Sequence, residues 1–352
     1  MRRTLSLATA LALLATLPVQ AQTGFSGAPA AADPALASPY AFAKSGKREE
    51  RAKAAEASGA RIVGGQESEP GKWPWQVALL FNGGPVSANA QFCGGSMLLD
   101  EWVLTAAHCV HMADESGNWG DLRPEALSVF VGSNIIAQGR GDVVPVRQIF
   151  VHPEYVGTAF DNDIALIRLD RAPTAPYATI KVPDAAFGDY LDQPGVVTVV
   201  TGWGLTEGGG NPSALREVEI QMMDRDLCNA ALMEGRAEEA GKGFGYAVDV
   251  FGLAYDDALP LWQELMARAP QPMSGNMLCS GTFEGGKSAC SGDSGGPLVV
   301  ALEDGSYIQA GVVSWGLSGE GGKGCAETAP FSAYTRVSNY LPWLESTIGA
   351  NP

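Results

Sequence analysis

The chain carries a single serine within a glycine-rich segment, Gly292-Asp293-Ser294-Gly295-Gly296-Pro297. Glycine lets the backbone bend sharply and lets a ligand approach closely. A carbonyl group could therefore reach the N–H groups of Gly292 and Ser294. Two such donors about 3 Å from a developing oxyanion form an oxyanion hole, and loss of one typically costs about 3–4 kcal/mol. A serine in a glycine-rich segment is more often an ordinary turn residue, so a catalytic interpretation of Ser294 depends on the rest of the chain.

The chain has only three histidines, and any imidazole chemistry must use one of them. His108 follows an apolar run directly, in Thr105-Ala106-Ala107-His108-Cys109. We interpret His111 as a loop residue and His152 as part of a surface turn at the end of a strand. His108, directly after the apolar run, is one candidate for such chemistry.

Short β-prone runs separated by Gly, Pro, Asn and Asp dominate the chain and predict an antiparallel sandwich or barrel. These runs are 75–80, 128–131, 164–169, 196–200, 297–302 and 308–313. Two helices are expected, one over Asp256–Ala269 and one over Val337–Ile348. We expect Asp256 or Asp257 to cap the first of them, with Pro260 in its first turn.

Five blocks together resemble the chymotrypsin-like (trypsin-fold) serine proteases, in the order found in that family. They are Arg61-Ile62-Val63-Gly64-Gly65, Thr105-Ala106-Ala107-His108-Cys109, Asp161-Asn162-Asp163-Ile164-Ala165-Leu166, Gly292-Asp293-Ser294-Gly295-Gly296-Pro297 and Ser314-Trp315-Gly316. The resemblance runs from about Arg61 to Ile348. It implies an all-β fold of two six-stranded antiparallel β-barrels, with a C-terminal helix and a partly helical insertion.

Carried over by motif, the catalytic roles fall to His108, Asp163 and Ser294. In such a triad the serine attacks, the histidine transfers the proton and the aspartate orients the histidine. The acid is assigned to Asp163, which directly precedes an isoleucine, rather than to Asp161. The segment also fits the G-x-S-x-G pattern of α/β-hydrolase esterases, but those run in the order Ser, acid, His. The order His, Asp, Ser found here argues against that class.

The resemblance further implies activation by cleavage between Arg61 and Ile62. The new α-amino group of Ile62 would pair with Asp293 and shape the oxyanion hole of Gly292 and Ser294. A free α-amino group titrates near pH 8. Pairing would raise that pKa, so we expect the active conformation to be lost at alkaline pH.

The six cysteines, at 93, 109, 228, 279, 290 and 325, predict three disulfides in an exported chain. Spacing alone allows fifteen pairings, and a zinc site is disfavoured because the chain has neither a CxxC nor an HExxH element. The resemblance implies Cys93–Cys109, Cys228–Cys279 and Cys290–Cys325. The second pair encloses 50 residues, more than is usual in the family. Residues 234–272 are therefore expected to be an insertion, either a solvent-facing embellishment or an extended subsite or exosite for the substrate.

The N-terminal region differs in composition from the rest. Arg2 and Arg3, an apolar run and Val19-Gln20-Ala21 predict a signal peptide over 1–21. Residues 22–61 are rich in Ala, Ser, Gly and Pro and predict a removable propeptide. Residues 62–352 form the expected protease domain. A signal peptide with disulfides indicates a secreted or periplasmic protein.

Charge and hydropathy exclude several classes of partner. The whole chain carries a formal net charge of −16, and residues 62–352 hold 15 basic and 35 acidic residues, a net of −20. Phosphate backbones need a basic surface, so we expect no nucleic-acid partner. After the signal peptide no apolar run reaches the roughly 18 residues of a membrane span. We expect no cofactor and no metal.

In the family that the chain resembles, the residue six positions before the nucleophile lies at the bottom of the primary pocket and influences substrate specificity. Here it is Ser288, where trypsin-like members have Asp. Burying a substrate cation without a partner costs several kcal/mol. Gly316 leaves one pocket wall open, and Ser332 stands where many members have Gly. With Ser314 and Trp315 these residues predict a preference for apolar or medium-sized side chains. Glu327 could supply a carboxylate from another direction.

The resulting prediction is a secreted serine endopeptidase made as a zymogen, acting on proteins or peptides. Since cleavage after Arg61 needs an enzyme that accepts arginine, a separate activating protease is expected. Two alternatives remain open: Arg/Lys specificity like that of trypsin, and a non-catalytic relative that only binds partners.

Overall fold

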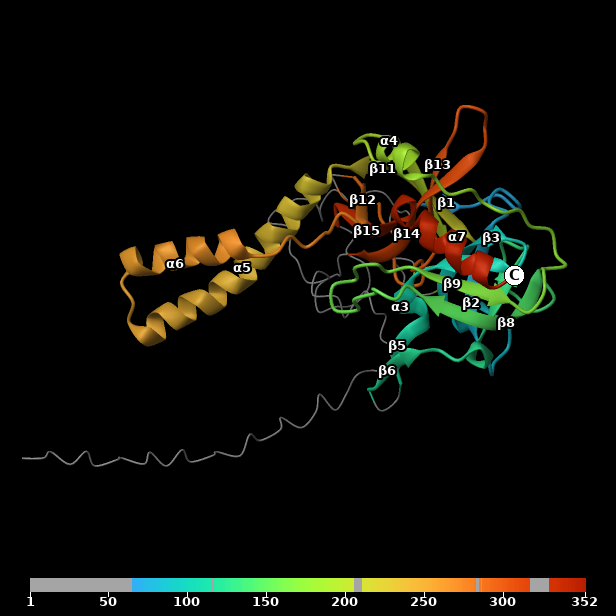
Figure 1. Ribbon diagram of the computed structural model, residues 1–352, viewed down its shortest axis with the longest axis horizontal. Coiled ribbons are helices and arrows are strands. Elements are labelled where there is room, and N and C mark those ends of the chain that lie inside the picture. The colour runs from blue at the N-terminus through green and yellow to red at the C-terminus, as the bar shows by residue number, and fades with distance from the viewer. Residues whose placement is uncertain (1–64, 115–116, 206–210, 283–284, 286, 317–328) are drawn as a thin grey trace, which may run out of the picture. The chain divides into compact units, whose positions relative to one another are not determined.

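The computed structural model describes residues 65–352, apart from 115–116, 206–210, 283–284, 286 and 317–328. Six antiparallel strands close the first barrel (Figure 1). In their order around it they are β2 (Gln76–Phe81), β3 (Gln91–Leu99), β4 (Trp102–Thr105), β9 (Ala165–Leu169), β8 (Asp142–Val151) and β7 (Leu127–Val131). β2 and β7 are almost wholly buried, because their apolar runs lie at the centre of the core.

The second barrel is also closed by six antiparallel strands, because β11 pairs with both β10 and β12. Around the barrel they are β11 (Arg216–Met223), β10 (Val197–Gly202), β13 (Pro297–Ala301), β14 (Tyr307–Gly316), β15 (Phe331–Arg336) and β12 (Met277–Gly281). The two-residue β1 (Gln66–Glu67) adds to β11 from outside. The predicted all-β class with two barrels is confirmed.

Short elements fill the connections. They are α3 (Ala107–Val110), the hairpin β5 (His111–Ala113) with β6 (Trp119–Asp121), α4 (Ala185–Leu191), and 3-10 turns at Ala88–Ala90 and Pro124–Ala126. The chain ends in a 3-10 turn, Val337–Tyr340, that continues into α7 (Leu341–Ala350). The predicted C-terminal helix is thus present, and its first turn is the tighter 3-10 form.

The insertion is more helical than the sequence predicted. A 27-residue helix, α5 (Arg225–Phe251), precedes α6 (Tyr255–Arg268), and the pair extends away from the strands in Figure 1. The sequence does not predict α5, because this segment contains several glycines and has no continuous apolar stripe. Its buried residues all lie near its start, between Cys228 and Gly235.

The second insertion helix, α6, lies where it was expected, but its capping differs. The residue before the helix is Ala254, whose side chain makes no capping bond. Asp256 and Asp257 lie within the first turn instead, where carboxylates interact favourably with the helix dipole. Pro260 lies beyond them, inside the helix.

Two of the expected disulfides are present, Cys93–Cys109 and Cys228–Cys279. Cys290 is disulfide-bonded as well, but Cys325 lies outside the described residues. The expected signal peptide and propeptide, 1–61, also lie outside them. Within the described part of the chain, no helix has the length and apolar character needed to cross a bilayer.

Candidate active site

His108 lies on α3, the single helical turn that follows β4. Its imidazole Nδ1 is 2.7 Å from Asp163 Oδ2, and its backbone N–H donates to Asp163 Oδ1 at 2.8 Å. Both residues are fully buried. A carboxylate at Nδ1 holds the proton there and leaves Nε2 as the acceptor. This is the tautomer that a general base needs.

Asp163 is itself held by contacts from the second barrel. The Ser314 hydroxyl on β14 donates to Asp163 Oδ2, and the Thr335 hydroxyl on β15 donates to its backbone carbonyl at 2.6 Å. Just before it, Phe160 and Asn162 adopt positive φ values of 53° and 56°. That conformation is uncommon for residues other than glycine. The turn before β9 therefore takes a constrained path, and both barrels determine where the carboxylate lies.

The neighbouring carboxylate, Asp161, has different partners. Its Oδ1 accepts hydrogen bonds from the Ser274 hydroxyl at 2.6 Å and from the Asn276 amide at 3.3 Å. Both donors lie at the end of the insertion. The structure therefore brings Asp163 to the histidine, while Asp161 attaches the insertion to the same turn.

Ser294 is almost completely buried, between two glycines with positive φ, Gly292 at 94° and Gly295 at 79°. The Ser294 carbonyl accepts from the N–H of Gly94 on β3 at 2.7 Å. A Cβ atom at Gly295 would lie 2.2 Å from Thr105 Oγ1 and 3.1 Å from Cys109 Sγ. Only a glycine allows this approach. The serine segment consequently packs against the segment that carries His108.

Asp293 is fully buried next to the candidate nucleophile. Its carboxylate accepts from the N–H of Gly204 and from the N–H of Cys290, each at 2.8 Å. A Cβ atom at Gly202 would lie 2.1 Å from Asp293 Oδ1. Arg61 and Ile62, the expected activation residues, lie outside the described residues.

Gly316, Ser332 and the residue after Ser288 lie close to one another. Gly316 on β14 pairs with Ser332 on β15. A Cβ atom at Gly316 would lie 3.6 Å from Ser332 Oγ and 4.0 Å from the carbonyl oxygen of Ala289, the residue after Ser288. Ser288, Ser314, Trp315 and Ser332 are all buried. Glu327 lies outside the described residues.

Tyr334, two residues after Ser332 on β15, is fully buried and was not among the site residues predicted from the sequence. Burial raises the pKa of its phenol, and the neighbouring Ser332 hydroxyl offsets part of that rise. Among the described residues neither hydroxyl has a well-aligned hydrogen-bond partner.

The other two histidines have separate partners. His111 Nδ1 lies 2.6 Å from Asp121 Oδ1, and His152 packs edge-on against Tyr340 and Trp343. Burial lowers the pKa of His152. Both positions are consistent with structural roles.

Among the described residues, Cys93, His108 and Cys109 form a cluster of the kinds that bind metals. The two sulfurs are bonded to each other, so neither is available as a thiolate ligand.

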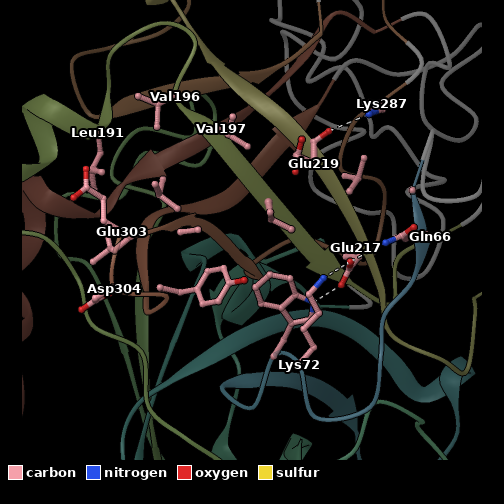
Figure 2. A pocket seen from close by; sticks show the side chains of 18 of the residues that line it. Gln66, Lys72, Leu191, Val196, Val197, Glu217, Glu219, Lys287, Glu303 and Asp304 are labelled. Carbon is pink, nitrogen blue, oxygen red and sulfur yellow. Dashed lines mark hydrogen bonds and ion pairs between the residues drawn. The ribbon is translucent and has the colours of Figure 1, made fainter.

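A separate hollow of about 970 Å³ lies on the outside of the second barrel and was not predicted (Figure 2). It contains none of the candidate catalytic residues. At one end Glu217 accepts from the Trp73 indole at 2.7 Å and from Lys72 and Gln66, as Figure 2 shows for the last two. Burial alone would raise the pKa of Glu217, but these hydrogen bonds outweigh it and hold the pKa below its usual range.

Comparison with known proteins identifies the family of the chain. The Trypsin family model matches residues 62–248 and 256–344. The suppressor of tumorigenicity 14 protein homolog of Bos taurus is 32% identical over 293 residues, covering 82% of this chain and 28% of that protein. The serine proteinase stubble of Drosophila melanogaster is 31% identical over 291 residues, covering 81% of this chain and 30% of that protein. The chain thus spans about three-tenths of the length of each. It belongs to the trypsin family, the chymotrypsin-like serine endopeptidases.

Proposed function

We propose that this protein is a secreted serine endopeptidase, made as a zymogen, whose catalytic residues are His108, Asp163 and Ser294. The observation that carries the proposal is the buried contact of 2.7 Å between His108 Nδ1 and Asp163 Oδ2, with the Ser294 segment packed alongside. Ser294 Oγ attacks the peptide carbonyl while His108 Nε2 accepts its proton. The imidazolium then gives that proton to the leaving amine, and water releases the acyl group by the reverse steps.

The N–H groups of Gly292 and Ser294 are the proposed donors to the oxyanion. The positive φ of Gly292 and the packing of Gly295 support this role, because they hold the segment in one conformation. Preorganised donors stabilise the transition state because they need no reorientation as charge develops.

Labelling by a fluorophosphonate tests the nucleophile. We expect the mature protein to form one adduct at Ser294 and the Ser294→Ala variant to form none. Peptide hydrolysis should fall by at least about 10⁴-fold in the same variant. A wild-type protein that folds, carries Ile62 at its N-terminus and still neither labels nor cleaves would favour the alternative, a protease-like binding protein.

For specificity, we propose a preference for apolar or medium-sized residues over Arg and Lys. The support is Ser288, whose hydroxyl cannot neutralise a buried guanidinium or ammonium, and Ser332, which narrows the pocket opposite Gly316. A peptide-library profile measures this directly. A profile dominated by Arg or Lys would instead establish the trypsin-like alternative, with Glu327 as the first carboxylate to replace.

Activation is proposed to occur by cleavage between Arg61 and Ile62, followed by pairing of the new amine with Asp293. The buried position of Asp293 supports a role as partner to a cation. Pairing raises the pKa of the amine above about 8, so its stabilising effect is present below that pH and lost as pH rises through the raised value. Full activity of an enzyme acetylated at Ile62 would contradict this.

A separate activating protease is proposed because a pocket that disfavours cations cleaves poorly after Arg61. The 22–352 proenzyme and its Ser294→Ala form should both convert slowly, and added trypsin should accelerate both equally. Rapid conversion of the wild type alone would mean that the enzyme activates itself. Export is tested by finding the mature protein in periplasmic or extracellular fractions, with Gln22 or Ile62 as its first residue.

A further inference from the structure

The helical insertion, α5 and α6, presents large apolar side chains to solvent at the end where its two helices meet. Its tip cluster consists of Tyr246, Val250, Phe251, Leu253 and Tyr255, which are 74%, 60%, 77%, 40% and 73% exposed. Contiguous exposed apolar surface usually marks a binding site. The family match omits residues 249–255, so the tip is a feature of this chain beyond the family pattern.

The tip is a defined structure. Gly252 ends α5 in the left-handed conformation, and the N–H of Leu253 donates back to the carbonyl of Val248 at 3.1 Å. Farther along the hairpin, the rings of Phe244 and Trp262 lie 5.3 Å apart and join the two helices. The exposed side chains therefore project from a closed turn between two paired helices.

At its other end the insertion is anchored firmly. The Cys228–Cys279 disulfide ties α5 to β12. Asn229 on α5 binds Met273 twice, by its amide to the Met273 carbonyl at 3.2 Å and by its side-chain oxygen to the Met273 N–H at 2.8 Å. The two ends of the insertion are thus joined where they leave the barrel.

This anchored end packs directly on the candidate active site. Leu232 and Met273 share a buried cluster with Phe160 and Trp315. The ring of Phe160 lies 5.5 Å from that of His108, and Asp161 accepts from Ser274 at the end of the insertion. The insertion is therefore continuous with the residues that surround His108.

The charge of the insertion restricts its partner. Residues 225–272 contain four basic and eight acidic residues, a formal net of −4. Anionic surfaces, including acidic membranes, are repelled by such a charge. An apolar segment with neutral or basic flanks is the complementary partner.

We propose that the tip cluster is an exosite, which binds an apolar, neutral-to-basic segment of the protein substrate at a distance from the cleaved bond. This inference rests on the proposed peptidase function. From Asn229 to Phe251 the helix is about 33 Å long, at 1.5 Å per residue. An extended substrate covers that length with about ten residues. Short peptides cannot engage the tip and the active site together, whereas unfolded protein chains can.

The test compares two substrates. One is a tetrapeptide ending in the residue that the enzyme prefers, and the other is reduced, carbamidomethylated lysozyme, an unfolded basic protein. We expect Phe251→Ser/Tyr255→Ser to lower kcat/KM on lysozyme about tenfold, mainly through KM, and to leave tetrapeptide hydrolysis within about twofold. Tyr190→Ser on α4, where the ring is 69% exposed, is the matched control and should change neither.

Peptides that carry a Leu-Phe-Leu-Phe segment sharpen the test. With the segment twelve residues from the cleaved bond, binding should depend on the tip, and with it two residues away it should not. Equal kcat/KM of wild type and tip variant on lysozyme would overturn the exosite. So would tip-dependent dimerisation in sedimentation velocity, or tip-dependent co-sedimentation with phosphatidylcholine vesicles.

A binding measurement with an inactive variant tests the exosite independently of catalysis. In the Ser294→Ala background, fluorescence anisotropy with labelled carbamidomethylated lysozyme should show about tenfold weaker binding when Phe251 and Tyr255 are replaced. Thermal unfolding should show that the tip variant is folded. An enzyme without hydrolytic activity would refute the proposed function and leave this binding result standing, whereas unchanged binding would refute the exosite alone.

Discussion

Glycines in the candidate active site and glycines in α5 occupy opposite surroundings. A Cβ atom at Gly202 would lie 2.1 Å from Asp293 Oδ1, and one at Gly295 would lie 2.2 Å from Thr105 Oγ1. A Cβ atom at Gly243 or Gly245 of α5 would meet nothing within 4 Å. In the site, glycine allows backbone and buried carboxylate to meet. In α5, it only lowers the stability of a helix.

The candidate active site is a region whose packing constrains each group, whereas the outer part of α5 tolerates change. Around Asp163, groups from both barrels satisfy one buried carboxylate, so any alteration leaves a polar group without its partner. In the outer part of α5 most side chains are exposed or half-buried, and apart from the contact of Phe244 with Trp262 a substitution there removes few contacts. The proposed functions follow the same division, with catalysis in the first region and substrate capture in the second.

The largest effect is expected from Asp163→Asn. The amide cannot hold His108 in the required tautomer, and in related Ser-His-Asp enzymes this change lowers kcat by about 10⁴-fold. Steady-state kinetics of the mature enzyme measure it, and fluorophosphonate labelling should slow in parallel. Asp161→Asn is the matched control, and an equal loss there would contradict the assignment of the acid.

Gly202→Ala should destabilise the protein by about 1–3 kcal/mol, because the new methyl group displaces the buried carboxylate of Asp293. Urea unfolding measures the change in the free energy of unfolding. Gly84→Ala, in open space, is the control. If the Gly202 variant were as stable and active as wild type, the site would be far less constrained than the comparison states.

The Asp142→Asn variant tests a charged position at the start of β8 in the first barrel. This position belongs neither to the candidate active site nor to α5. Hydrogen bonds from Arg171 and Thr174 hold the pKa of Asp142 well below its usual range, although burial opposes them. The carboxylate therefore stabilises the fold above its unfolded pKa, near 4, and this stabilisation is lost as pH falls through the lowered value. After allowance for solvent screening, we expect a loss of about 1 kcal/mol at pH 7.

Urea unfolding of the Asp142→Asn variant at pH 7 and at pH 3 measures this contribution. The difference from wild type should shrink at the lower pH, where the unfolded state takes up a proton at Asp142. A difference that stayed the same at both pH values would rule out the charge as its cause.

The smallest effect is expected from Gly243→Ala and Gly245→Ala, which should stabilise α5 by about 0.5–1 kcal/mol each. Hydrogen exchange of the α5 amides measures the stability of the helix itself. Faster exchange in either variant would show that these positions serve a close approach, as the glycines of the site do.

The sequence predicted the all-β fold and indicated the residues proposed to carry the chemistry because both signals are encoded locally. Alternating turn residues and β-prone runs mark strands, and short motifs carried His108, Asp163 and Ser294 through the family resemblance. The same local signals failed for α5, whose glycines weaken the helical pattern. That helix begins at a capping Asp224 and is held at its start by a disulfide and the Asn229–Met273 pair, which join residues distant in the chain.

What the sequence determined by itself is therefore the class of fold, the candidate triad and the presence of an insertion. Tertiary structure alone decided that Ser314 and Thr335 hold Asp163, that Asp161 binds the insertion, and that an apolar tip lies far along a helix whose other end packs on the site. The physical reason is the separation along the chain over which each kind of signal acts. Strand and motif signals act over a few residues, whereas the hydrogen bonds at Asp163 and Asp161 join residues 113 to 172 positions apart and form only when both barrels have closed.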